Sequence, residues 1–443
     1  MNQTRQEKIS LINGKIHTRS GTASNLTFED GRIVSIDDDS GSFSGRLIDL
    51  HGRTVLPAFC DTGVNFLSWA ERQERLNLSG VHSAKEFKDS LAAYFQAKQN
   101  PLRGWYIAEN LSDDVAVSRD DIEEIVASKP CAVIDAGNTH IILNSAAMNE
   151  LNMPQDSVEP EEFSQHLPKL KPDEIKFLFK NYSPKAGALG ISEIWAEFYE
   201  PENSEIWNVL SDEIYDSLNF RLRCSFGFQN VNSLNEFLAS GLRTGDGLPF
   251  CKIGGILIKS ELDQQEQKNM IYSAHLSGCQ VISDNNKSCL NALERVVKKV
   301  RKNSRHLVKN FIEGSLIERM KILNFGGIAV LNQGKNGNFI HEAFQNGIVA
   351  SAGSGENLTS PLKNIGKLVS DGLSVAEALS IYTWSAAWNG GNDLRRGELA
   401  VGNDADFVIL EQDPFSVRPE EISLIDVTST FTAGCAVYES GAL

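Results

Sequence analysis

Cysteine and histidine, which are well suited to metal binding and nucleophilic chemistry, are scattered in this sequence without a recurrent spacing. The seven cysteines include no C-x-x-C pair, and their number is odd. Because most lie in apolar segments, we expect buried free thiols in a reducing cytoplasm rather than a disulfide framework. Seven of the eight histidines also lack a paired spacing, and His275 and His341 lie in helix-like contexts that favour surface or packing roles. The seven are His17, His51, His82, His166, His275, His306 and His341.

The bulk composition is that of a globular protein with a sizeable core. Of 443 residues, 41% are hydrophobic and 23% are charged. The net charge of -16 disfavours nucleic acids and anionic membranes as partners. The polar segment Met1–Ser10 is not followed by an apolar stretch, and no apolar run is long enough to cross a bilayer. We therefore expect no signal peptide, no membrane association and a cytoplasmic location.

Both ends of the chain show β patterns. Asn13-Gly14 and Asp30-Gly31 each separate two short strand-like segments, and both dipeptides favour the positive φ of a tight hairpin turn. A β pattern returns near the C-terminus, at Asp406–Leu410 and Val427–Thr432. We predict that residues 1–58 and 396–443 form one small composite β-sandwich domain.

The middle of the chain, residues 59–395, alternates apolar strand-like runs with amphipathic helical segments such as Asn286–Lys302. Ser374–Trp388 is the clearest helix, because Ser374 and Glu377 form a capping box. Asn149–Asp173 is predicted to be an exposed connection. The alternation predicts an α/β fold with a (β/α)8 TIM barrel. The expected strands are Ala132–Asp135, Ile191–Ile194, Arg221–Phe228, Phe250–Ile253, Cys279–Ser283, Leu307–Ile312, Ile328–Leu331 and Ile348–Ala352.

Several phrases resemble the amidohydrolase superfamily. "GRTVLPAFCD" (Gly52–Asp61) is similar to the entry into its first barrel strand, and "GELAVGNDADFVILEQDP" (Gly397–Pro414) to the return into its β domain. "NTHIILNSAAM", within Ser118–Leu151, and "GALGISEI" (Gly187–Ile194) resemble the amidohydrolase-3 branch, which includes N-substituted formamide deformylase-like enzymes. The resemblance implies a TIM barrel with one or two divalent metals at its C-terminal mouth and hydrolysis of a C–N bond.

The positions at which this family holds its metal carry other residues here. The His-x-His pair of the first strand falls on Gly63 and Asn65, and the histidine of the fifth strand on Ser283. The histidine of the sixth strand falls on Gly314, and the catalytic aspartate of the eighth on Gly355. These residues are poor zinc ligands or none, so we expect no metal cofactor although the family implies zinc or another divalent ion.

A few residues of the implied site remain. Lys252 matches a lysine of the fourth strand, where an ordinary salt-bridging or anion-binding role competes with a bridging-ligand role. Asp284 is expected to point away from the site, because it neighbours Ser283 on a strand. His140 matches a substrate-pocket histidine, with a hydrogen-bonded loop position as the alternative. The candidate catalytic residues are Lys252, Glu356 and Asp61, the last also explicable as a hydrogen-bonded strand-end carboxylate. The candidate pocket residues are Asn65, His140, Lys252, Ser283, Glu313 and Ser354.

Two functions are consistent with this pattern. The first is a metal-free, catalytically silent protein of the amidohydrolase fold that binds a small molecule or partners an active homologue. A homodimer and a heteromer with an active homologue both remain open as assemblies. The second is a hydrolase of non-peptide C–N bonds with a rebuilt site, made either of lysine and carboxylates or of oxygen ligands for a metal such as Mg²⁺.

Overall fold

The computed structural model describes residues 7–37, 45–153, 157–199, 203–214, 218, 220–302, 304–309, 315–331 and 337–441. The chain divides into two compact units, one made of Met1–Phe66 with Phe179–Leu443 and the other of Leu67–Leu178. In the described part of the chain, no helix has both the length and the apolar character needed to cross a membrane.

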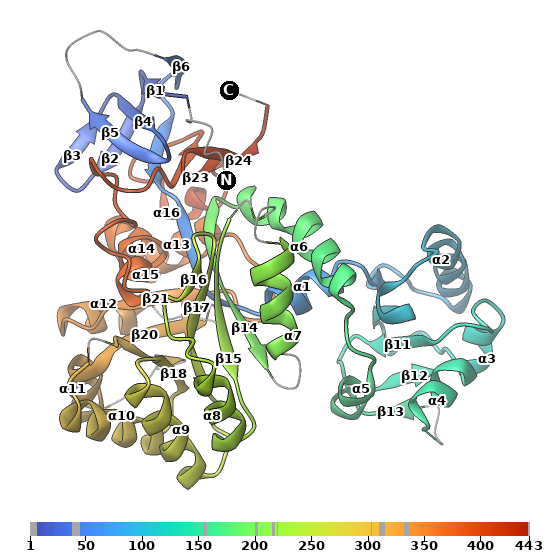
Figure 1. Cartoon of the computed structure of the whole chain (residues 1–443). Helices are drawn as coiled ribbons and strands as arrows, with labels where there is room; N and C mark the ends of the chain where they lie inside the picture. The colour runs from blue at the N-terminus through green and yellow to red at the C-terminus, as the bar shows by residue number, and fades with distance from the viewer. Residues whose placement is uncertain are drawn as a thin grey trace. The chain divides into compact units, whose positions relative to one another are not determined.

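The first unit contains the barrel, which confirms the predicted (β/α)8 fold (Figure 1). Within the described residues, eight parallel strands follow one another in the sheet, and a bridge between Val64 and Gly355 joins the last to the first. Asn65 N–H donates to Gly355 O at 2.9 Å, and Gly355 N–H donates to Gly63 O at 2.8 Å. The strands are β8 (Phe59–Val64), β14 (Ile191–Tyr199), β15 (Arg221–Gly227), β17 (Cys251–Ile258), β18 (Gln280–Asp284), β19 (His306–Lys309), β20 (Gly326–Leu331) and β21 (Ala350–Gly353).

Barrel closure gives glycine a structural role at the first and last strands. A Cβ atom on Gly353 would lie 2.6 Å from both N and O of Gly63, too close for any side chain. The backbone at Gly63 is thus used to close the barrel.

Helices follow most barrel strands and cover the outside of the sheet. In α10, Leu290, Leu293 and Val296 are buried at the three-residue spacing of one helix face, and Asn286 caps the first turn. The capping box of Ser374 and Glu377 is confirmed, but the helix predicted at 374–388 is two helices that meet at Thr383. The helices are α7 (Asn203–Asn208), α8 (Val231–Ala239), α9 (Gln264–Leu276), α10 (Lys287–Lys299), α11 (Leu316–Phe325), α12 (Gly337–Gln345), α13 (Pro361–Ser370), α14 (Val375–Tyr382), α15 (Trp384–Asn389) and α16 (Pro419–Ile422).

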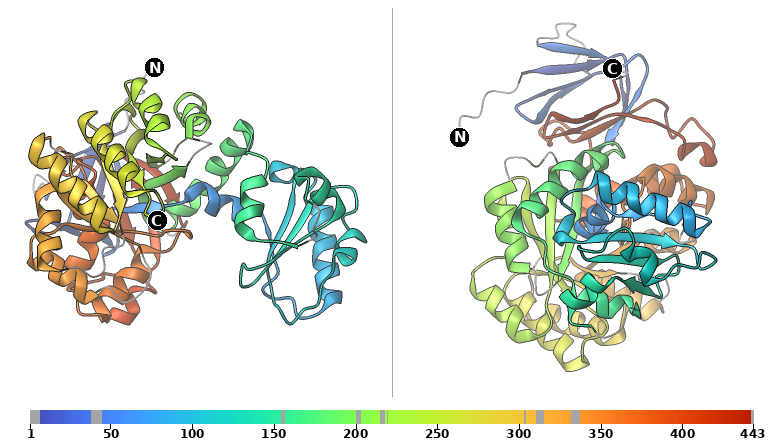
Figure 2. Two further views of the ribbon diagram at one scale, coloured as in Figure 1. Left: turned by 90° about the horizontal axis from the view of Figure 1, so that it is seen from below. Right: turned by 90° about the vertical axis from the view of Figure 1, so that its right-hand side faces the viewer.

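The two ends of the chain meet in a β-sandwich, as the blue and red strands of Figure 2 show. Phe28 from one sheet packs on Phe407 and Phe431 from the other. One sheet has the order β5 (Arg32–Ile36), β4 (Leu26–Glu29), β1 (Ile9–Ile12), β6 (Arg46–Asp49). The other has the order β24 (Cys435–Glu439), β23 (Val427–Thr432), β22 (Phe407–Leu410), β7 (Thr54–Pro57), β2 (Lys15–Thr18), β3 (Gly21–Ala23).

The two predicted hairpins have different outcomes. Asp30-Gly31 joins the antiparallel strands β4 and β5, as expected. The prediction at Asn13-Gly14 is wrong, because β1 pairs with β4 and β6 whereas β2 pairs with β3 and β7. Asn13 has the expected positive φ of 57°, but its turn passes the chain from one sheet to the other. The dipeptide predicts a turn, but it does not determine which strands pair on either side of that turn.

The second unit is an α/β subdomain that the sequence did not reveal. Ala132–Asp135, predicted to be a barrel strand, lies in β11 of this unit, and the first barrel strand is β8, which follows the phrase Gly52–Asp61 as the resemblance implied. The segment predicted to be an exposed connection contains β13 and α5, with Phe163 buried. The sheet order is β13 (Ser157–Val158), β12 (Ile141–Leu143), β11 (Cys131–Asp135), β10 (Tyr106–Leu111), β9 (Leu76–Asn77). The helices are α2 (Ala84–Ala97), α3 (Arg119–Glu123), α4 (Ser145–Leu151) and α5 (Pro160–His166), with α1 (Phe66–Arg72) and α6 (Pro172–Gly187) at the unit's boundaries.

Candidate active site at the barrel mouth

The carboxyl ends of the barrel strands carry a buried ion pair. Trp195 and Leu307 belong to the apolar cluster inside the barrel. Because strand side chains alternate, Glu197 and Lys309 lie on the same face, one step closer to the mouth. Lys309 Nζ lies 2.6 Å from Glu197 Oε1 and 2.7 Å from Oε2. The two side chains are only 12% and 13% exposed, so this pair is well shielded from water.

Tyr199, at the end of the same strand as Glu197, extends this cluster. Its hydroxyl donates to Glu197 Oε2 at 3.0 Å, and Lys259 Nζ lies 4.0 Å from the centre of its ring. Burial raises the pKa of Tyr199, and the neighbouring Glu197 carboxylate raises it further. The phenol is therefore a neutral hydrogen-bond donor, and the arrangement presents two ammonium groups, a carboxylate and a hydroxyl at the mouth.

Asp61 is a second buried acid, in the first barrel strand. Its Oδ1 accepts hydrogen bonds from the backbone N–H groups of Gly63 at 3.2 Å and Ser354 at 3.1 Å. Its Oδ2 is buried and has no hydrogen-bond partner. Burial raises the pKa of Asp61 to about 6, and the hydrogen bonds from Ser354 and Gly63 oppose that rise. The hydrogen bonds expected from the sequence are present, although Asp61 lies inside β8 and not at its end, and they satisfy only one oxygen.

Replacing Asp61 by Asn should change how stability depends on pH. The pKa is raised from 3.8 to about 6, so folding favours the protonated acid, and stability is lost as pH rises from about 4 to about 6. A shift of roughly two pKa units corresponds to about 3 kcal/mol. Asn keeps the Oδ1 acceptor and carries no charge. We expect the free energy of unfolding of Asp61→Asn, relative to the native chain, to increase by about 2 kcal/mol between pH 4 and pH 7. Urea unfolding at several pH values measures this, and a difference that stays constant with pH would refute it.

The donors that the structure describes at the mouth do not fit a zinc site. Among the residues that the structure describes, no three His, Cys, Asp or Glu side chains are grouped so as to hold a metal ion. Glu197 is neutralised by Lys309, and Asp284 accepts a hydrogen bond from Ser260 N–H at 2.8 Å. Zinc sites use imidazole, thiolate or free carboxylate ligands, and an ammonium group at the same place repels a cation.

Three of the predicted residues lie where the last strand meets the first. Ser354 Oγ lies 3.1 Å from Thr359 Oγ1 and accepts the N–H of Thr359 at 3.0 Å. Asn65 and Gly355 contribute backbone hydrogen bonds to the closure. Glu356 is exposed, and its charge acts on Tyr199, which places it near the mouth.

The facing of β18 corrects the prediction for the fifth strand. Ile282 belongs to the cluster inside the barrel, so the alternation puts Asp284 on the inner face and Ser283 on the outer one. The effect of the Asp284 charge on Tyr199 agrees with this. Ser283 is fully buried, and its hydroxyl has no hydrogen-bond partner. The position predicted for the fifth-strand histidine is therefore wrong by one residue, because Asp284 and not Ser283 faces the barrel interior.

Lys252 lies at the wrong end of the barrel for the predicted role. It is the second residue of β17, whose mouth end is Ile258, and its Nζ donates to Gly247 O at 2.8 Å. Its position therefore excludes it as a member of the mouth site. Lys259, which follows β17 directly, lies at the mouth end of this strand together with Tyr199.

The other predicted site residues remain predictions. His140 lies in an exposed turn of the second unit, where its backbone N–H donates to Asp135 Oδ1 at 3.1 Å. Glu313 and Gly314 lie outside the described residues.

Glu197, Tyr199 and Lys309 were not among the site residues predicted from the sequence. The strand predicted at Ile191–Ile194 stopped before the two residues that matter, although Trp195, Glu197 and Tyr199 continue its alternation. The strand predicted at Leu307–Ile312 placed Lys309 in its middle, whereas β19 as described is His306–Lys309, and residues 310–312 lie outside the described residues. The usable signal was the alternate spacing of Glu197 and Tyr199.

Part of the chain matches a known family model, and two named proteins resemble the chain in sequence. The model of the amidohydrolase family matches residues 362–438. "Putative amidohydrolase YtcJ" of Bacillus subtilis (strain 168) is 22% identical and aligns with 92% of this chain and 93% of its own. "Exoenzymes regulatory protein AepA" of Pectobacterium carotovorum subsp. carotovorum is 28% identical over 33% of this chain and 35% of its own.

Solved structures show the same fold. An uncharacterized metal-dependent hydrolase from Pyrococcus furiosus superposes with a TM-score of 0.77 and 17% identity, covering 92% of this chain and 100% of that one. The corresponding protein from Pyrococcus horikoshii gives a TM-score of 0.75 and 16% identity, covering 93% and 99%.

Proposed function

Because this chain belongs to the amidohydrolase superfamily and its amidohydrolase-3 branch, we propose that it is a metal-free, catalytically silent member that binds a small polar molecule at the barrel mouth. Such a protein retains the fold of the family but lacks its metal-assisted hydrolysis.

The observation that carries the proposal is the Glu197–Lys309 pair. Glu197 lies in β14 and Lys309 in β19, so the ion pair connects two separate strands inside the barrel. The Lys309 ammonium, 2.6 Å from Glu197 Oε1, balances the charge of this buried carboxylate without a metal ion. Such a pair preserves a charged, hydrogen-bonding mouth without an ion.

The groups at the mouth suit recognition of a polar ligand. Lys259 and the Tyr199 hydroxyl lie beside the ion pair, so donors and an acceptor converge from three strands. Ligand sites in this fold are built at this end of the barrel. AepA, which resembles a third of the chain, is named as a regulatory protein of exoenzymes, and this name supports a non-catalytic role.

One observation favours a second candidate, a hydrolase with a rebuilt site. The buried Asp61 has a pKa of about 6 and an oxygen with no hydrogen-bond partner. A carboxyl group that titrates near neutral pH is suited to general acid–base chemistry. In this case Asp61 and the Glu197–Lys309 pair, rather than Lys252, would perform the proton transfers.

A turnover screen separates the two candidates. The full chain is assayed with N-formyl and N-acyl amines, with and without chelator, beside Asp61→Asn and Lys309→Met. We expect no turnover above the buffer rate in any sample. Turnover that survives chelation and is abolished by Asp61→Asn would replace the silent function by the rebuilt hydrolase.

A further inference from the structure

The end of the barrel opposite the mouth has a cavity with an excess of basic side chains. It has a volume of about 430 Å³ and lies where the β-sandwich meets the first residues of β15 and β17. This volume is in the range of small-molecule sites. The basic residues that line it are Arg32, Arg221, Lys252, Arg395 and Arg396.

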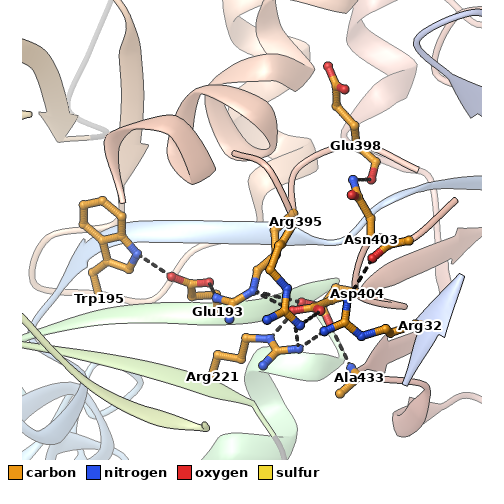
Figure 3. Close-up of polar contacts among 12 residues, drawn as sticks. Arg32, Glu193, Trp195, Arg221, Arg395, Glu398, Asn403, Asp404 and Ala433 are labelled. Carbon is orange, nitrogen blue, oxygen red and sulfur yellow. Dashed lines mark hydrogen bonds and ion pairs between the residues drawn. The ribbon is translucent and has the colours of Figure 1, made fainter. Parts of the chain in front are cut away.

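Three of these arginines are balanced by carboxylates (Figure 3). Arg221 donates from Nε to Asp406 Oδ2 at 2.8 Å and from Nη2 to Asp404 Oδ2 at 3.2 Å. Arg396 binds Glu193 at 2.7 Å and Asp404 at 3.1 Å, and Arg395 binds Asp404 at 2.6 Å. Three guanidinium groups thus face three acids, and this network joins the sandwich to the barrel.

The remaining two cations bind only carbonyl oxygens in the contacts that the structure shows. Arg32 Nη1 donates to Gly402 O at 3.1 Å, and Lys252 Nζ donates to Gly247 O at 2.8 Å. Asp30 is the only other acid in the cavity lining. Since a carbonyl does not neutralise a cation, positive charge is left over on two sides of one cavity.

The walls of the cavity are held in place. The turn at Gly31 approaches Ala433 so closely that a Cβ on Gly31 would lie 2.9 Å from Ala433 O. Arg32 is next to this turn, and Ile33 N–H donates to Asn403 O at 2.9 Å. Pro249 and Phe250 add an apolar wall, with the Arg221 guanidinium 5.1 Å from the Phe250 ring centre.

We propose that this cavity is a binding site for a small phosphate monoester, whose phosphate lies between Arg32 and Lys252 and whose organic part lies against Pro249 and Phe250. Arginine and lysine are the usual phosphate ligands, and a dianion matches two unneutralised cations better than a carboxylate does. The site is independent of the function proposed for the mouth, and it gives Lys252 an anion-binding role.

Calorimetric titration of the full chain with phenyl phosphate, inorganic phosphate and benzoate tests the site. Phenyl phosphate is expected to bind saturably, and benzoate about tenfold or more weaker because it carries one charge. Arg32→Gln and Lys252→Gln should each weaken phenyl phosphate by about tenfold or more while melting at the native temperature. The matched control is Arg19→Gln, which removes the same charge from an 81% exposed side chain in a different cavity.

Three results would overturn the assignment. The first is the absence of saturable binding. The second is equal binding of benzoate, which would make the ligand a carboxylate. The third is an equal loss in Arg19→Gln, which would indicate attraction by overall charge rather than a built site.

Discussion

Replacing Lys309 by Ala is expected to destabilise the protein by about 3–5 kcal/mol, because it leaves the Glu197 carboxylate buried without its cation. The carboxylate is 13% exposed, and the Tyr199 hydroxyl alone does not compensate its charge. Urea unfolding at pH 7 measures the change. Lys298→Ala is the matched control, since that lysine is 66% exposed and its helix-surface pair with Glu294 contributes only about 0.3–0.5 kcal/mol.

A double substitution separates the charge from the packing. Glu197→Gln with Lys309→Met removes both charges and retains an acceptor for Tyr199, so we expect it to recover most of the stability lost in Lys309→Ala. If Lys309→Ala costs no more than Lys298→Ala, the pair is not the buried element described here.

Acid is expected to destabilise the protein through His306 by about 5 kcal/mol in total. Val281 N–H donates to His306 Nδ1 at 2.9 Å, so His306 Nε2 carries the proton that it donates to His275 Nδ1 at 2.8 Å. His275 Nε2 then donates to Val300 O at 2.7 Å. Each ring nitrogen of His306 and His275 has a hydrogen-bond partner only while both rings are neutral. Burial, and to a smaller extent the neighbouring His275, lowers the pKa of His306 to about 3.

The direction in which stability changes with pH follows from the lowered pKa of His306. Stability from neutral His306 is present above pH 6.5 and is lost as pH falls towards 3, at about 1.4 kcal/mol per pH unit. Between pH 6.5 and pH 4.5 the native chain should lose about 2 kcal/mol relative to His306→Gln, which does not titrate. The exposed His82→Gln serves as the control. Parallel pH profiles for the native chain and His306→Gln would contradict the account.

Local signals in the sequence were sufficient where the structure depends on local chemistry. The Asp30-Gly31 turn needs positive φ next to two pairing strands, and the Ser374 cap needs only its own first turn. Asn13-Gly14 shows the limit, because the same turn chemistry serves a passage between sheets. Which strands pair is decided by the sandwich core of Phe28, Phe407 and Phe431, and that contact joins opposite ends of the chain.

The mouth site was less predictable for a related reason. A strand's inner face and its last residue are set by its neighbours in the barrel, so a one-residue error exchanged Ser283 for Asp284. The same dependence hid Lys309, whose partner Glu197 is 112 residues away in the chain. Lys252 was matched by its sequence phrase, and a phrase does not say at which end of a strand a side chain lies. The prediction that Gly63 and Asn65 hold no zinc rests on residue type alone, because neither side chain is a good replacement for imidazole.

The most direct test of the central claim is the metal content of the purified full chain after incubation with zinc, manganese or magnesium and removal of the unbound ion. The account predicts far less than one ion per chain, with no difference between the native protein, Asp61→Asn and Asn65→Ala. One ion per chain that is lost in Asp61→Asn or Asn65→Ala would contradict it, because those residues would then hold a metal at the mouth.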